Sequence, residues 1–97
     1  MKKPLDSAPW KPVNIEIADA SAIQALAQGT ADATQQKRAL DWIIKVVAGT
    51  YDQSYRPGAD GDRDTAFAEG KRFVGTSIVK ATILNVSKLR RLENEGK

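Results

Sequence analysis

The sequence has no cysteine and no histidine, and these two absences exclude many kinds of site. A chain without cysteine has no disulfide, no thiolate nucleophile and no cysteine-based zinc site. A chain without histidine lacks the side chain that serves most often as a general base or metal ligand. Aromatic residues make up only 6% of the chain, so few large side chains are available to anchor a core. We therefore expect no enzymatic activity, no metal and no cofactor.

Long apolar segments are also absent. Every uncharged stretch is shorter than the roughly 20 apolar residues that a bilayer-spanning helix needs, and no apolar run follows the basic start Met1-Lys2-Lys3-Pro4 as it would in a signal peptide. The sequence therefore predicts a cytoplasmic chain with no membrane partner. Its 97 residues, 41% hydrophobic and 28% charged, suit one small globular domain with a thin core, or a part of an assembly.

The net charge of +3 combines two blocks of opposite sign. Acidic residues outnumber arginines between residues 49 and 69, whereas every charged residue between 70 and 92 is basic. This arrangement favours self-complementary association or a basic face that binds phosphate. A solvated helix whose end charges match its dipole explains it equally well. The candidate partner or phosphate contacts are Lys71, Arg72, Lys80, Lys88, Arg90 and Arg91.

Residues 1–17 are predicted to form an extended N-terminal arm. Three prolines in the first twelve residues lack an amide donor and favour extended conformations in the residues before them. Trp10 lies between two of these prolines and is the candidate anchor of the arm, either on its own domain or on a neighbouring subunit. The surface around Trp42 and Val46 is one candidate acceptor for its ring. The alternation of apolar and polar residues over 13–17 is typical of a short strand that adds to a sheet edge.

Two helices are predicted in the first half of the chain. The first covers Asp19–Gln28, with Asp19 or Ser21 as N-cap and Gly29 as the stop signal. The second covers about Gln35–Ala48 after the capping residue Thr34 and closes at Gly49. Its inner face is widened by Trp42 and Val46, which suggests packing on two sides. The residues of that inner face are Leu40, Ile43, Ile44 and Val47.

A third, longer helix is predicted from about Thr65 to Leu92, with Asp64 as N-cap. At this length it would extend about 40 Å, longer than a small domain is wide, so part of it should project. The predicted fold is mostly α, with a short, a medium and a long helix in a domain at 18–92 and a flexible tail at 93–97. One face of the long helix contains Phe67, Gly70, Val74, Ile78 and Ala81.

Two glycines within this helix have the spacing of a phosphate-binding loop, but Thr76 stands where that loop has its lysine. Each glycine costs about 1 kcal/mol inside a helix relative to alanine, so close contact with a neighbouring helix should offset the cost. A helix break near Gly75 is the alternative. The predicted helix-packing residues are Trp42, Phe67, Gly70, Val74 and Gly75.

Acidic residues in this half suggest no ligand chemistry. Residues 60–64, Asp-Gly-Asp-Arg-Asp, begin like a calcium loop, but Thr65 and Lys71 stand where the loop needs glycine and glutamate. A turn and a helix cap explain these aspartates. Glu69 has neither a partner acid nor a histidine, so we interpret it as half of an intrahelical or intersubunit ion pair.

Three stretches of the chain, Gln36–Ile43, Tyr51–Tyr55 and Asp64–Gly75, together resemble a family of small tailed-bacteriophage proteins. The family is typified by protein 19 of a Bordetella podophage, and the resemblance covers about residues 35–84. Its most specific part is a helix start of the form F-x-E-G-R/K-R-x-V-G, in which Lys71 stands where arginine is frequent. The resemblance implies no chemistry. It implies a role in particle assembly near the portal and packaging genes.

From these observations we predict a non-enzymatic bacteriophage virion or assembly component. It should be a helical homo-oligomer of the portal or head–tail connector region that binds phage structural proteins and no small-molecule substrate. Its location should be the host cytoplasm during assembly and then the virion. One alternative is a DNA-packaging factor that resembles a small terminase subunit and binds duplex DNA. Another is a host-directed inhibitor, for which the sequence offers no positive feature.

Overall fold

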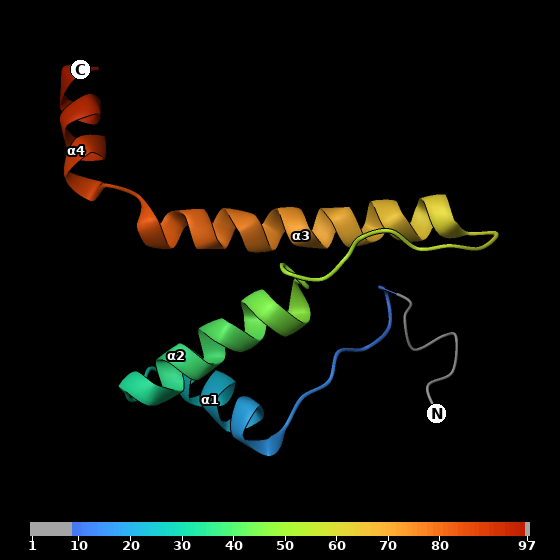
Figure 1. Ribbon diagram of the computed structural model, residues 1–97. Coiled ribbons are helices and arrows are strands. Elements are labelled where there is room, and N and C mark those ends of the chain that lie inside the picture. The colour runs from blue at the N-terminus through green and yellow to red at the C-terminus, as the bar shows by residue number, and fades with distance from the viewer. Residues whose placement is uncertain (1–8, 97) are drawn as a thin grey trace.

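The computed structural model describes residues 9–96, which form four α-helices, one π-helical turn and no strand. The mostly α fold predicted from the sequence is confirmed. The strand predicted over residues 13–17 is wrong, because residues 12–16 have no regular structure and Ile17 opens the first helix. The elements are α1 (Ile17–Gln28), α2 (Ala33–Trp42), the π-helical turn η2 (Ile43–Val47), α3 (Gly61–Ile83) and α4 (Val86–Glu95) (Figure 1).

Helix α1 begins two residues before its predicted start. Its N-cap is Glu16, and the Asp19 carboxylate accepts the backbone N–H of Glu16 at 3.1 Å in a reciprocal capping pair. Asp19 therefore lies in the first turn instead of capping the helix. Gly29 ends α1 in the left-handed conformation at φ 75°, as its position in the sequence predicted.

Helices α1 and α2 pack against each other through alanine. Ala22 of α1 and Ala39 of α2 are both fully buried, and small side chains allow the two backbones to approach closely. The Asp19 carboxylate also binds the Arg38 guanidinium at 2.8 Å, which ties the start of α1 to α2. This contact fixes the two helices while burying little apolar surface.

Helix α2 is capped by Asp32, not by Thr34. The Asp32 carboxylate accepts the backbone N–H of Gln35 at 2.8 Å, and the Gln35 side chain accepts the N–H of Asp32 in return. After Trp42 the helix widens into η2, where Ala48 donates its N–H to the Ile43 carbonyl at 2.9 Å. Ile44 is the buried residue of the predicted inner face.

Helix α3 starts and ends earlier than the long helix predicted from the sequence. It begins at Gly61 after an Asp60 N-cap, so Asp64 lies within the first turn. The predicted continuation to Leu92 is wrong, because Leu84 is extended and the Asn85 side chain accepts the N–H of Lys88 at 2.9 Å to cap a new helix. Helix α4 then continues to Glu95, into the range predicted as a tail.

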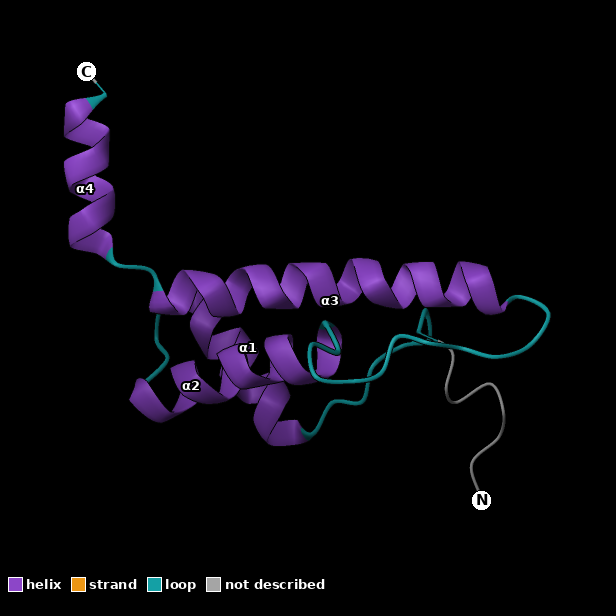
Figure 2. Ribbon diagram, turned by 45° about the horizontal axis from the view of Figure 1, so that its top comes forward, coloured by secondary structure: helices purple, strands orange, loops and turns teal. Residues whose placement is uncertain are grey.

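The other three helices lie on two sides of α3. Helices α1 and α2 lie on one side of α3, and α4 leaves the C-terminal end of α3 on the other side (Figures 1 and 2). Within residues 9–96, α3 contacts η2 and α4 contacts no other helix. The radius of gyration is 17.2 Å, whereas a compact chain of this length has about 13 Å. The molecule is therefore extended.

The core of the single chain is small. Its buried apolar residues are four alanines and one isoleucine, and in the described range no large side chain is fully buried. Since buried apolar area is the main favourable term in folding, such a core supplies little stability by itself. No helix in this range is long and apolar enough to cross a membrane.

Candidate functional site

The joint between α3 and the end of η2 is built around Gly75 and Thr50. Thr50 is only 3% exposed, and its hydroxyl donates to the Ile44 carbonyl at 2.6 Å. A Cβ atom on Gly75 would overlap the Thr50 hydroxyl oxygen and lie 2.9 Å from the Ala48 Cβ. Only glycine allows α3 to approach this closely, so the tight contact predicted at Gly75 is confirmed. Its neighbours are Ala48 and Thr50, and the helix continues unbroken.

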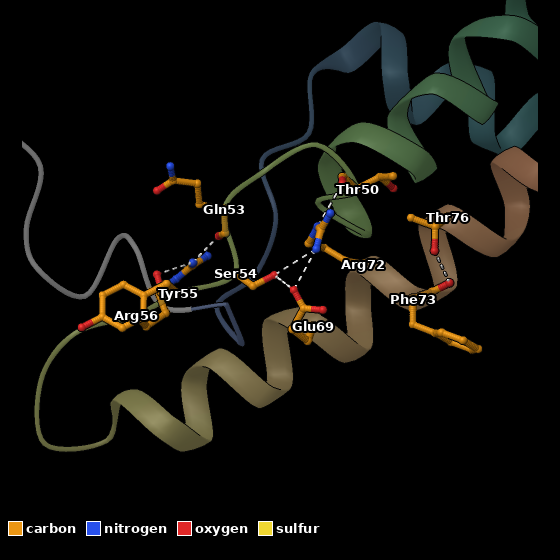
Figure 3. A network of polar contacts seen from close by, with 9 residues as sticks. All are labelled: Thr50, Gln53, Ser54, Tyr55, Arg56, Glu69, Arg72, Phe73 and Thr76. Carbon is orange, nitrogen blue, oxygen red and sulfur yellow. Dashed lines mark hydrogen bonds and ion pairs between the residues drawn. The ribbon is translucent and has the colours of Figure 1, made fainter.

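A polar network ties the loop after η2 to α3 (Figure 3). The Arg72 Nε donates to the Thr50 carbonyl at 3.1 Å, and its Nη1 donates to the Glu69 carboxylate at 2.8 Å. The Ser54 hydroxyl donates to the same carboxylate. Two residues further along the loop, the Arg56 N–H donates to the hydroxyl of Thr65, one helical turn before Glu69, at 2.8 Å. These contacts hold the loop along the N-terminal half of α3.

Glu69 serves this network as a charged acceptor. The Ser54 hydroxyl donates a hydrogen bond to the carboxylate, and this bond, followed by that from Arg72, holds the pKa of Glu69 below its ordinary value. A lowered pKa keeps the carboxylate ionised at neutral pH, which suits an ion pair and not proton transfer. The interpretation of Glu69 as half of an intrahelical ion pair is confirmed, with Arg72 as its partner.

Two side chains hold the N-terminal arm against its own chain. The Lys71 ammonium donates to the Pro9 carbonyl at 2.8 Å, and the Trp42 Nε1–H donates to the Asn14 carbonyl at 2.9 Å. Pro9 is buried, whereas Trp10 is 53% exposed. The part of the arm from residue 9 onward therefore packs in cis. Its observed anchors are Lys71 and Trp42, and the Trp10 ring is only half covered.

The apolar face that the sequence identified on α3 is largely uncovered. We call Phe67, Gly70, Val74, Ile78 and Ala81 the outer face of α3. Phe67 is 48% and Val74 54% exposed, Ala81 is exposed, and only Ile78 is partly buried. Nothing lies within 4 Å of the position that a Cβ on Gly70 would occupy. The tight helix–helix contact predicted for Phe67, Gly70 and Val74 is therefore not made by any other helix within residues 9–96.

Helix α3 buries a different face. Its buried residues are Gly61, Ala68 and Gly75, which are spaced seven residues apart and therefore lie on one side of the helix. These residues have little or no side chain, so a search for periodic large apolar residues does not find this face. The outer face thus remains available to something outside the chain.

Helix α4 is amphipathic, and no other described helix covers it. Val86, Leu89 and Leu92 follow one another at three-residue spacing, and all three are about half exposed. We call them the apolar face of α4. Ile83 and Leu84, at the junction with α3, are also exposed. The C-terminal third of the molecule therefore presents a row of apolar side chains with no partner helix in the described chain.

The six candidate cationic contacts fall into two groups. Lys71 and Arg72 are half-buried and donate to backbone carbonyls of their own chain, so they act in the fold. The other four are exposed, and in the described part of the chain none of them forms an ion pair. These four are Lys80, Lys88, Arg90 and Arg91.

Comparison with known proteins adds no relative. No protein-family model, curated protein or solved structure matches the chain. The resemblance of residues 35–84 to the phage family stays a prediction. The geometry of the chain is what supports a function.

The sequence did not point to Thr50 or Ser54. Thr50 follows Ala48-Gly49 at the end of a predicted helix, and this position offered a signal, because hydroxyl residues there often bond to the last free carbonyls. The carbonyls of Pro9 and Asn14 gave no such signal, since a backbone acceptor is the same at every residue.

Proposed function

We propose that this chain is a non-enzymatic structural subunit that acts by assembling with copies of itself. The observation that carries the proposal is the uncovered apolar surface of α3 and α4. Monomeric proteins rarely expose contiguous apolar patches of this kind, because water contact with them is unfavourable. A second polypeptide packed on this surface would remove its contact with water.

The shape of the chain supports the same function. The whole chain has an accessible surface of 7761 Å², whereas a compact monomer of its mass has about 5,400 Å². An obligate homodimer buries about 2,000 Å² or more in total. The surplus of two such chains together is about 4,700 Å², which lies in the range of about 2,000–5,000 Å² that obligate dimers bury over both chains, so association would complete a core that the single chain lacks.

The setting in which such a subunit would act comes from the resemblance of residues 35–84 to small tailed-phage proteins. That resemblance favours a virion or assembly role in the portal or head–tail connector region, with other phage structural proteins as further partners. A small helical subunit from which α4 projects suits a ring or array, in which each copy contacts its neighbours.

The mass in solution tests the proposal. The full chain should elute from a sizing column with a light-scattering mass that is a multiple of 10.5 kDa. Leu89→Gln combined with Leu92→Gln should return it to the mass of one chain with unchanged helix content, because both residues are exposed within the chain. Leu26→Gln, at an exposed leucine of α1, is the matched control. A wild-type chain that stays single at every concentration would contradict self-assembly.

Duplex DNA is a second candidate partner, favoured by the four exposed cations Lys80, Lys88, Arg90 and Arg91. If they neutralise phosphates, log affinity should fall with log salt by about 0.9 for each contact. Replacing Lys88, Arg90 and Arg91 with glutamine should flatten that slope by nearly 3. Lys71→Gln should leave the slope unchanged, because Lys71 donates to the Pro9 carbonyl. No binding at about 50 mM salt would remove this candidate.

A further inference from the structure

The outer face of α3 contains a glycine that the fold of the chain does not explain. Gly75 lies against Thr50 and Ala48, but the space beside Gly70 is open. A glycine in the middle of a helix is unfavourable relative to alanine, because it lacks a side chain and gains more freedom in the unfolded chain. Gly70 also lies between the exposed Phe67 and Val74. Its place on an apolar face points to close approach by another helix.

We propose that this helix is α3 of a second copy of the chain, paired in antiparallel orientation about a two-fold axis at Val74. The proposal rests on the proposed function of self-assembly and adds its geometry. In this register each residue of one α3 lies opposite a residue of the other α3, and the two residue numbers of every such pair add up to 148. Val74 therefore meets Val74 of the second copy, and the outer faces of the two helices cover each other.

The sizes of the side chains are complementary in this register. Phe67 lies opposite Ala81, so the largest residue of the face meets a small one. Gly70 lies opposite Ile78, so the missing side chain makes room for a branched one. Packing of large against small side chains across facing positions is what allows two helices to interdigitate without voids. The same pairs occur twice, once on each side of the axis, as a two-fold interface requires.

Charge favours the antiparallel orientation over the parallel one. The start of α3 contains Asp62 and Asp64 against Arg63 and follows the N-cap Asp60, whereas its end contains Lys80 and is followed by the basic helix α4. Antiparallel copies place the acidic end of each helix near the basic end of the other and oppose their helix dipoles. Parallel copies would place like charges together.

The arrangement of the helices leaves room for this pairing. The buried face of α3 is the one that meets η2, and α4 leaves α3 on the side away from α1 and α2 (Figures 1 and 2). A second α3 along the outer face would bring its own N-terminal half near α4. The apolar face of α4 (Val86, Leu89 and Leu92) would then have a partner surface, which α4 lacks within its own chain.

Single-cysteine variants test the register directly, because the chain has no cysteine of its own. Val74→Cys should form a disulfide-linked dimer on mild oxidation, since Val74 lies on the axis. Phe67→Cys and Ala81→Cys should form linked dimers when mixed and not alone, because two copies of the same position lie about 21 Å apart along the helix axis. Lys80→Cys is the control for random collision, because Lys80 lies on another face. Light scattering before oxidation identifies variants that still assemble.

The cross-linking pattern and the mass in solution decide between the possible arrangements. An assembled chain in which Val74→Cys cross-links no better than Lys80→Cys overturns the antiparallel pairing and leaves self-assembly standing. Efficient linkage of Phe67→Cys and of Ala81→Cys each alone indicates parallel helices and also overturns it. A wild-type chain that never exceeds the mass of one copy overturns the proposed function and this inference with it.

Gly70→Ala provides a second, independent measurement. The added methyl group should raise the helix content of the single chain, because the space beside Gly70 is open within it. It should also raise the dissociation constant of the assembly at least tenfold, because the methyl group would meet Ile78 of the second copy. A Gly70→Ala variant that associates as tightly as the wild type would overturn the close contact at this position.

Discussion

Replacing Gly75 with alanine is expected to lower the free energy of unfolding of the single chain by about 2 kcal/mol. The new Cβ would overlap the Thr50 hydroxyl oxygen and lie 2.9 Å from the Cβ atoms of both Ala48 and Thr50. Overpacking of this kind costs about 1–3 kcal/mol, and occasionally more. Because the overlap is with a buried residue, we expect a cost at the upper end, of which the better helix propensity of alanine returns about 1 kcal/mol.

Urea unfolding followed by far-ultraviolet circular dichroism measures this change, at a concentration where the wild-type mass is that of one chain. Gly70→Ala is the matched control and should stabilise the single chain by about 0.5–1 kcal/mol, since it only improves helix propensity there. Adding Thr50→Ala to Gly75→Ala should cost less than the sum of the two changes, because the overlapping hydroxyl is gone. Equal stability of the two glycine variants would refute the joint at Gly75.

Replacing Trp42 with alanine should lower the free energy of unfolding by about 2–3 kcal/mol. The indole ring is half-buried between α2 and the arm, and its Nε1–H donates to the Asn14 carbonyl at 2.9 Å. Removal of the ring loses both its packing and that hydrogen bond. Of the two side chains described as holding the arm, Lys71 then remains, so release of the arm should accompany the loss of stability.

Trp42→Phe separates the two contributions, because it keeps an aromatic ring and removes only the donor. Its cost should be about 1 kcal/mol, the net value of one hydrogen bond. In this variant Trp10 is the only tryptophan left, so a red shift of its emission would report release of the arm. Trp10→Phe, at a ring that is half exposed, should change stability less than Trp42→Ala does. A Trp42→Ala variant as stable as the wild type would show that the arm is not anchored there.

The helices were largely predictable because their signals are local. Gly29 ends α1 at the residue expected, since a left-handed cap depends only on the glycine and its neighbours. Helix starts were predicted less well. The N-cap positions are occupied by Glu16, Asp32 and Asp60, where Asp19 or Ser21, Thr34 and Asp64 were expected. Several acidic and hydroxyl residues stand near each start, and the one that caps is chosen by the direction in which the chain enters.

The break between α3 and α4 follows the same logic. Asn85 is a good N-cap, but the surrounding residues favour a continuous helix equally well. In the structure Leu84 is extended and the Asn85 side chain caps α4. Local propensity alone does not choose between one long helix and two shorter ones.

The candidate site was predictable only in part. Apolar periodicity identified the outer face of α3, and the cost of a helical glycine identified the contact at Gly75. Neither signal could name Thr50 as the neighbour of Gly75, or assign Lys71 to a backbone carbonyl of the arm, because such contacts join residues far apart in the chain. Of the six cations predicted to contact a partner or phosphate, Lys71 and Arg72 are used within the fold, and for the other four such contacts stay a prediction.

The sequence by itself determined the helical class, the lack of cysteine and histidine chemistry, and the existence of an apolar face on α3. Only the tertiary structure decided which face of α3 is buried. Hydrophobic periodicity measures how apolar a face is but contains nothing about what lies opposite it. The segment after η2 approaches α3 so closely at Gly75, and the Arg56 carbonyl at Gly61, that only glycine suits these two positions of the buried side. The more apolar face is left outward because no further helix within residues 9–96 covers it.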